Sequence, residues 1–200
     1  MARFSQVFVI ILLLLGGVTT TAAAATVEEM LAEGSLGSDK APVTVIEYAS
    51  LTCPHCAAFA TTTFEAFKKK YVDTGKVHFI YRDFPFDQPG LRAAMMVRCS
   101  GPERFFGFLE ILFKSQESWA SAGDPLGELA KIARLGGMSK EEFDACMKNK
   151  ELMDGILKGE LDAQQKYKVQ ATPSFIVNDV LHEGNISLEQ FDGILAPLLK

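Results

Sequence analysis

Two cysteines separated by two residues, Cys53 and Cys56, are the part of the sequence that points most directly to chemistry. Pro54 and His55 stand between them, an apolar run ends at Ser50 just before them, and a helical pattern follows. A strand, a tight loop and a helix that begins on a thiol are the usual setting of a redox-active dithiol. The pair therefore predicts thiol–disulfide exchange.

The expected helix explains why the two thiols should differ. Cys53 falls at its N-terminus, where unpaired backbone N–H groups and the helix dipole favour a negative sulfur. Pro54 suits the first helical turn, and His55 adds a nearby donor or positive charge. Cys56 lies one turn further on and less exposed, so Cys53 is the candidate nucleophile and Cys56 the resolving thiol. Because the thiolate exists only in the reduced form, each unit by which its pKa falls makes the disulfide more oxidising by roughly 30 mV.

The same motif has two plainer interpretations, a structural disulfide or half of a zinc site. A zinc site normally takes four N or S ligands, usually from two close pairs. The remaining cysteines, Cys99 and Cys146, are isolated and far apart in the sequence, so we expect no metal. They lie on separate expected helices. We favour a structural disulfide between them, as suits an exported chain, and two buried free thiols are the alternative.

Three further residues are candidates for a place beside the cysteines. Glu47 interrupts the apolar run before the loop. A carboxylate there moves protons for Cys56, or it simply faces solvent, and the two interpretations carry equal weight. Thr172 and Pro173 precede a later apolar run. The proline marks the start of a strand, or it forms a cis bond that brings its loop against the cysteine pair.

The elements that must position these residues follow from hydrophobic periodicity. A strand over 43–50, a helix from the cysteine loop to about residue 72 and a strand over 77–81 predict a parallel pair with a crossover helix. A largely helical region follows, and then a hairpin that turns at Asn178-Asp179. The remaining expected elements are helices over 26–34, 89–100, 103–117, 126–135, from Ser139, 152–167 and from Ser187 through Leu199, and strands over 174–177 and 180–183. This order predicts an α/β fold, a mixed sheet with helices on both faces.

The first 25 residues read as a secretory signal peptide. Arg3 gives a basic start, Phe8 to Val18 is almost wholly apolar, and small residues up to Ala25 offer a cleavage site. An uncleaved anchor is the alternative, but spanning a membrane takes roughly 20 apolar residues, more than this core holds. The chain of 200 residues has a net charge of −5 and no basic cluster that would favour nucleic acid.

Taken together, the Cys53-Pro54-His55-Cys56 motif, Thr172-Pro173 and the helical region between them resemble the DsbA family of thiol–disulfide oxidoreductases, over about residues 41–199. The resemblance implies a thioredoxin fold in two parts, 26–86 and 168–200, with a helical subdomain inserted over 87–167. It implies that His55 stabilises the Cys53 thiolate and that Glu47 is a buried acid. It also implies that Pro173 is a cis proline beside the substrate and that Thr172 contacts the substrate backbone. Asn178-Asp179 replaces a turn that is commonly Asn-Gly in this family.

The function implied by the resemblance is a periplasmic oxidase that passes its disulfide to exported proteins with free cysteines. A DsbB-type membrane oxidase would reoxidise it, and no cofactor is expected. A disulfide isomerase or reductase, kept reduced by a partner, is the alternative, and a metal- or peptide-binding module that keeps the fold is a third. Only residues 26–42 precede the first strand, too few for a large oligomerisation arm, so we expect a monomer.

Overall fold

The computed structural model describes residues 25–200, and the expected signal peptide lies outside this part of the chain except for Ala25. A five-stranded mixed sheet forms its centre, with the strands in the order β1-β3-β2-β4-β5. No helix among the described residues is long and apolar enough to cross a membrane. The strands are β1 (Gly34–Leu36), β2 (Val43–Ala49), β3 (Val77–Asp83), β4 (Ser174–Val177) and β5 (Val180–Glu183).

Strand β2 is the central strand of the sheet, and it leads directly into the cysteine loop. It pairs in parallel with β3, as expected from the strand–helix–strand order, and antiparallel with β4. All of its residues except Thr44 are buried. Because β2 is paired with a strand on each side and packed on both faces, its end is held in place, and the loop that follows starts from a well-defined position.

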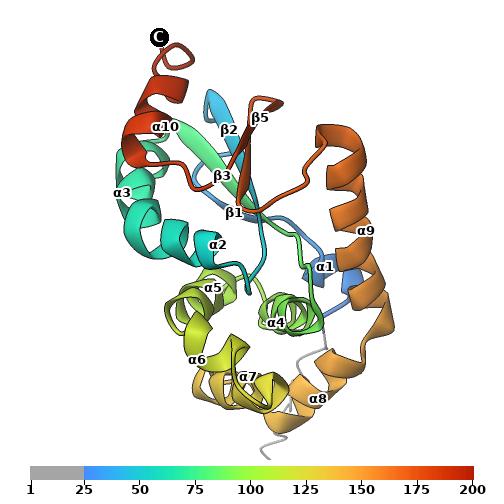
Figure 1. Ribbon diagram of the computed structural model, residues 1–200. Coiled ribbons are helices and arrows are strands. Elements are labelled where there is room, and N and C mark those ends of the chain that lie inside the picture. Colours follow the sequence, from blue (N-terminus) through green and yellow to red (C-terminus); the bar gives the residue numbers. More distant parts are fainter. Residues whose placement is uncertain (1–24) are drawn as a thin grey trace, which may run out of the picture.

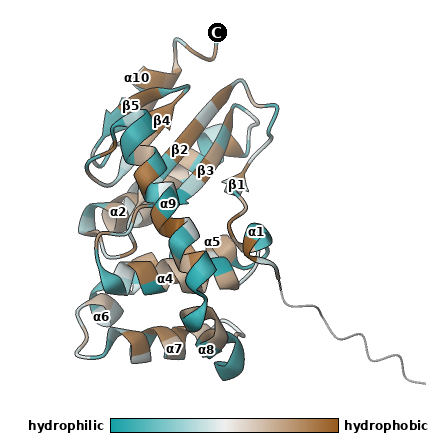
Figure 2. Cartoon of the chain, turned by 90° about the vertical axis from the view of Figure 1, so that its right-hand side faces the viewer, coloured by the Kyte–Doolittle hydropathy of each residue, from teal (hydrophilic) through white to brown (hydrophobic). Residues whose placement is uncertain are grey.

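Helices cover both faces of this sheet, which confirms the predicted fold class (Figure 1). On one face lies the helix that starts at the cysteine loop, together with α10 (Leu188–Leu195). On the other face lies α9 (Lys150–Tyr167), along which hydrophilic and hydrophobic stretches alternate (Figure 2). The cysteine-loop helix is continuous but contains two π-helical stretches. Its segments are α2 (Pro54–Ala58), η1 (Phe59–Thr63), α3 (Phe64–Phe67) and η2 (Lys68–Val72).

The chain between β3 and β4 is helical, and most of it lies at one end of the sheet (Figure 1). Its first helix, α4 (Gln88–Cys99), is largely buried. It contacts α9 and three other helices: α5 (Phe105–Lys114), α7 (Pro125–Leu135) and α8 (Lys140–Lys148). A disulfide between Cys99 on α4 and Cys146 on α8 joins two of these helices. The short helix α6 (Gln116–Ala120) follows α5.

Three of the expected elements differ from the structure. The helix expected over 26–34 is the single turn α1 (Val27–Met30), and the chain then enters the short edge strand β1. The helix expected over 103–117 is broken into α5 and α6 at Ser115, whose hydroxyl donates to the carbonyl of Ile111. The last helix ends at Leu195 instead of Leu199, because Pro197 has no backbone N–H to continue the helical hydrogen bonds.

The hairpin between β4 and β5 has the predicted bounds. Its turn residues, Asn178 and Asp179, have φ angles of 44° and 70°. Such left-handed backbone is most accessible to glycine, but Asn and Asp tolerate it, so the departure from Asn-Gly leaves a tight turn in place. The Asn178 side chain also accepts a hydrogen bond from the backbone N–H of Thr44, at 3.0 Å.

Candidate active site

The cysteine loop has the strand–loop–helix arrangement that the sequence predicts. The backbone N–H of Cys53 donates to the carbonyl of Ser50 at 3.1 Å, which closes a turn directly after β2. Cys53 then has extended backbone and precedes the first helical residue, Pro54. Pro54 and His55 are exposed, whereas the side chains of Cys53 and Cys56 are buried free thiols. The loop therefore presents its two central residues to solvent and holds both sulfurs just beneath.

The segment before β4 lies against the first cysteine. The Thr172–Pro173 peptide bond is cis, and the Cys53 sulfur lies 3.3 Å from the Thr172 carbonyl oxygen. The Thr172 side chain is buried. Its hydroxyl interacts with both cysteine sulfurs and favours their charged forms. The fold thus brings Thr172 to the cysteine pair from more than a hundred residues away.

The pKa values of the two thiols are shifted in opposite directions. The Cys56 thiol donates a hydrogen bond to the Cys53 sulfur, and this bond does most to lower the Cys53 pKa to about 5; burial opposes it. The Thr172 hydroxyl and the backbone N–H groups of Cys56 and His55 lower it further. Burial, followed by the neighbouring Cys53 sulfur and the Glu47 carboxyl, raises the pKa of Cys56 far above its usual range. At neutral pH the pair therefore consists of a Cys53 thiolate and a Cys56 thiol.

His55 acts on Cys53 through its backbone. The sequence suggested an imidazole near the thiolate, but the His55 side chain is exposed to solvent. The interaction that lowers the Cys53 pKa comes from the His55 backbone N–H, in the first turn of α2. This is the usual behaviour of a helix N-terminus toward a negative group.

Glu47 is buried in the centre of the sheet, so the solvent-facing interpretation is wrong. Its side chain is 4% exposed, and its neighbours in register are Tyr81 on β3 and Phe175 on β4. Burial, assisted by the nearby Cys53 charge, raises the pKa of Glu47 to about 8. A carboxyl group that remains largely protonated at neutral pH thus lies close enough to interact with both thiols.

Sequence reasoning missed the residues that hold the loop from the helical region. The Gln116 amide, at the start of α6, donates to the carbonyls of Leu51 and Cys53 at 2.8 and 2.9 Å. The Thr52 hydroxyl donates to Asp87, at 3.1 Å, and Asp87 caps the first turn of α4. An Asp two residues before a proline is a helix-start signal that could have marked Asp87. Gln116 carries no such local signal.

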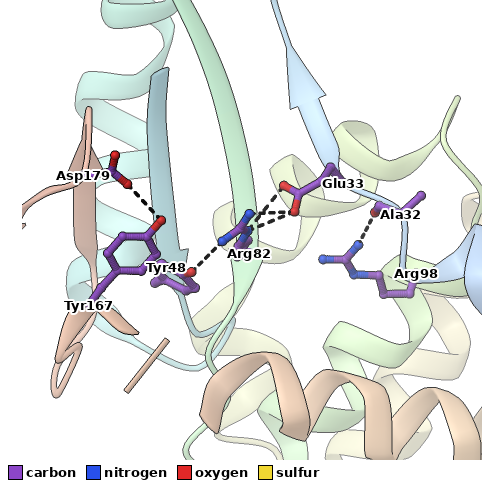
Figure 3. A network of polar contacts seen from close by, with 7 residues as sticks. All are labelled: Ala32, Glu33, Tyr48, Arg82, Arg98, Tyr167 and Asp179. Atoms are coloured by element: carbon purple, nitrogen blue, oxygen red, sulfur yellow. Dashed lines mark hydrogen bonds and ion pairs between the residues drawn. The ribbon is translucent and has the colours of Figure 1, made fainter. Parts of the chain in front are cut away.

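Ion pairs support the end of β3. Arg98 on α4 contacts Asp83, the last residue of β3, at 2.7 Å, and both side chains are buried. Arg98 also donates to the carbonyl of Ala32, while Arg82 binds Glu33 and the Tyr48 hydroxyl (Figure 3). Among residues 25–200, no group of three His, Cys, Asp or Glu side chains is placed to hold a metal ion.

Comparison with known proteins agrees with this arrangement. Residues 29–196 match the protein family described as Thioredoxin. A Rickettsia typhi protein whose name describes a protein-disulfide oxidoreductase is 37% identical over 155 residues, which are 77% of this chain and 57% of that protein. Disulfide bond formation protein D of Bacillus subtilis is 34% identical over 154 residues, 72% of this chain and 67% of that one.

Among solved structures, the crystal structure of alpha-DsbA1 from Wolbachia pipientis superposes with a TM-score of 0.77 at 36% identity, covering 84% of this chain and 90% of that one. The chain spans little more than half of the Rickettsia relative but nearly the whole of this structure. These matches extend over both parts of the sheet and the helices between them. The chain therefore belongs to the thioredoxin family and, within it, to the DsbA-like thiol–disulfide oxidoreductases.

Proposed function

We propose that this protein oxidises pairs of thiols in exported proteins by thiol–disulfide exchange. A substrate thiolate attacks the Cys53 sulfur of a Cys53–Cys56 disulfide, which forms a mixed disulfide and releases Cys56. A second substrate thiolate then attacks the substrate sulfur of the mixed disulfide and releases the Cys53 thiolate. The substrate loses two electrons and gains a disulfide, and the protein becomes the reduced dithiol.

The observation that carries the oxidising direction is the low pKa of Cys53, about 5. The interactions that lower it exist only after the disulfide is reduced, so they favour reduction of the protein and oxidation of its substrate. A thiol of low pKa is also the better leaving group, so the second step releases Cys53 readily. In a reductase, by contrast, the disulfide form of the protein must be favoured over the reduced dithiol.

The other residues of the site take supporting roles in this proposal. Cys56 is the resolving thiol, and it leaves the first step as a strongly basic sulfur that needs a proton. Glu47, which is buried nearby and largely protonated at neutral pH, supplies that proton. Pro54 starts the helix, and the backbone of His55 stabilises the Cys53 thiolate. Thr172 and Pro173 form the surface against which the substrate backbone lies.

The proposed location is the periplasm. The signal-peptide pattern in residues 1–25 supports it, and so does the Cys99–Cys146 disulfide, since such bonds persist in oxidising compartments. The substrates are then newly exported proteins with free cysteines, and a DsbB-type membrane oxidase restores the Cys53–Cys56 disulfide. The name of the Bacillus subtilis relative, disulfide bond formation protein D, agrees with this role.

The experiment mixes one equivalent of the oxidised protein with a reduced, unfolded protein that contains two cysteines. We expect stoichiometric transfer of the disulfide, and loss of transfer in Cys53→Ser and in Cys56→Ser, because neither variant can form the Cys53–Cys56 disulfide. When the substrate is supplied in its disulfide form instead, the Cys53 thiolate of Cys56→Ser should attack that disulfide and remain trapped as a mixed disulfide. The Cys99→Ala/Cys146→Ala variant is the control and should transfer its one remaining disulfide. Failure to oxidise the substrate, with ready reduction or rearrangement of an existing disulfide, would favour the reductase or isomerase instead.

A further inference from the structure

A cavity of about 470 Å³ lies between the cysteine-loop helix, α5 and the sheet. Cys53, Thr172 and Pro173 do not line it, so it is separate from the surface proposed for the protein substrate. Its volume is within the range of roughly 300–1,000 Å³ that holds small ligands. Most of its wall is apolar, and the apolar side chains are Leu36, Phe64, Phe79, Phe106, Leu109 and Phe113.

Two buried polar groups face this apolar cavity. Glu47 and Tyr81 lie opposite each other in the pairing of β2 with β3, and both line the cavity. Their side chains are 4% and 2% exposed, and neither Glu47 Oε1 nor the Tyr81 hydroxyl has a hydrogen-bond partner among residues 25–200. Leaving a buried polar atom without a partner carries a free-energy cost. A ligand that donates hydrogen bonds at this point would remove that cost.

Charges at the rim favour a cation over an anion. Lys68 pairs with Asp73 outside the cavity, and Lys114 pairs with Glu110. Glu65, also on the rim, makes no ion pair within the described part of the chain. Together with Glu47, the lining has more carboxyl than ammonium groups, and the lysines are already paired.

The wall formed by the cysteine-loop helix is irregular at the same place. Ala60 and Thr61 line the cavity and belong to the π-helical stretch η1. Such single π-turns occur frequently at functional sites. The Thr61 hydroxyl donates its hydrogen bond to the carbonyl of Ala57, so it does not donate to Glu47 Oε1 or to the Tyr81 hydroxyl.

We propose that this cavity binds a small amine with an apolar body, with the ammonium group on Glu47 and Tyr81 and the body among the phenylalanines. This site goes beyond the proposed oxidase function and does not depend on it. The ammonium donates to Glu47 Oε1 and to the Tyr81 oxygen. The aromatic walls surround the rest of the molecule and supply most of the buried apolar area.

Binding should release a proton, because Glu47 must ionise to pair with the ammonium. Its pKa of about 8 means that the free protein holds this carboxyl largely protonated at neutral pH. The other titratable or charged groups around it are Tyr81 on β3, the two cysteines of the loop, Glu65 and Lys68 on the cysteine-loop helix, and Glu110 and Lys114 on α5. The affinity for an amine should therefore rise between about pH 6 and pH 8.

The test uses 2-phenylethylamine, with 2-phenylethanol and phenylacetate as neutral and anionic analogues, and measures binding to the reduced protein by calorimetry and NMR. We expect the amine to bind at least tenfold more tightly than the alcohol and phenylacetate not to bind. Glu47→Gln should remove the preference for the amine and leave weak binding of both neutral and cationic probes.

A matched pair of glycine variants locates the site. Gly107 on α5 lines the cavity and is itself exposed, and a Cβ added there meets no atom within 4 Å, so Gly107→Leu should place a bulky apolar side chain at the mouth of the cavity. Gly193 on α10 also has open space around it and lies outside the cavity, so Gly193→Leu is the control. Binding should be lost in the first variant and unchanged in the second.

Three outcomes would overturn the proposal: equal affinity for amine and alcohol, amine binding that survives Gly107→Leu, or no binding of the amine at millimolar concentration. The proposal would also be overturned if crystals soaked with the amine showed only ordered water at Glu47. The disulfide-transfer assay, run on the same samples without amine, reports on the oxidase function separately.

Discussion

The sulfur of Cys53 lies 3.3 Å from the carbonyl oxygen of Thr172, 119 residues later in the chain. A protonated thiol can donate to this carbonyl, but a thiolate cannot, so the contact does not stabilise the charged form. The Cys53 thiolate depends instead on donors that point at the sulfur, above all the thiol of Cys56. The low pKa of Cys53 therefore depends mainly on the thiol of Cys56.

Replacing that donor should make Cys53 less acidic. In Cys56→Ala the Cys53 pKa should rise by at least about one unit from its value near 5, because the strongest interaction with the thiolate is gone. In Cys56→Ser a hydroxyl can still donate, so the rise should be smaller. Titration of the thiolate absorbance in the far ultraviolet measures both. Equal values in the two variants would remove the Cys56 thiol from this account.

The stability of the reduced protein should depend on pH through two opposed groups. The Cys53 pKa is lowered to about 5, so its stabilising effect is complete above the unfolded value of about 8.5 and is lost as pH falls toward 5. The Glu47 pKa is raised to about 8, so its stabilising effect is complete below about 4.3 and is lost as pH rises toward 8. Between pH 5 and 8 the two effects should largely cancel.

Glu47→Gln should remove this cancellation. The reduced variant should then gain on the order of 1 kcal/mol of unfolding free energy for each pH unit between about 5 and 8, from Cys53 alone. Urea denaturation in the presence of a reductant measures the slope. The double variant Glu47→Gln/Cys53→Ser is the control and should lose it. A slope in Glu47→Gln no steeper than in the unchanged protein would contradict the shifted pKa values.

The link between the loop and the helical region should contribute measurably to stability. Gln116→Leu leaves the carbonyls of Leu51 and Cys53 without their amide donor, which should cost about 1–3 kcal/mol. It should also make Cys53 react faster with a bulky thiol reagent, since the loop is less firmly held. Gln164→Leu is the matched control, because Gln164 is exposed on α9 and its side chain, within residues 25–200, bonds only to Glu160. Equal stability of the two variants would show that Gln116 does not hold the loop.

Removing one partner of the buried Arg98–Asp83 ion pair should lower the stability of the protein more than replacing both partners by apolar residues. Arg98→Met leaves the Asp83 carboxylate buried and unpaired, so we expect a loss of about 3–5 kcal/mol in chemical denaturation. Arg98→Met/Asp83→Leu removes both charges and should recover much of that loss. If the double variant is less stable than the single one, the stability lost in Arg98→Met comes from losing the ion pair itself and not from leaving Asp83 as an isolated buried charge.

The sequence predicted the cysteine loop, the parallel pairing of β2 with β3 and the bounds of the β4–β5 hairpin, because each has a local signal. Alternation placed Glu47 on one face of its strand, but its burial follows from β2 being the central strand, which depends on segments far away. The contact of Gln116 with the loop is equally non-local. The short edge strand β1 has only three residues, too few for a periodic pattern.

The redox equilibrium of the Cys53–Cys56 pair against glutathione buffers, measured in the Cys99→Ala/Cys146→Ala variant, distinguishes an oxidase from a reductase. A Cys53 pKa near 5, about 3.5 units below the usual value, predicts a couple on the order of 100 mV more oxidising than the same dithiol without the stabilised thiolate. The disulfide should then be reduced by mildly reducing glutathione mixtures. A potential near that of thioredoxin, roughly −270 mV, would contradict the proposed oxidase.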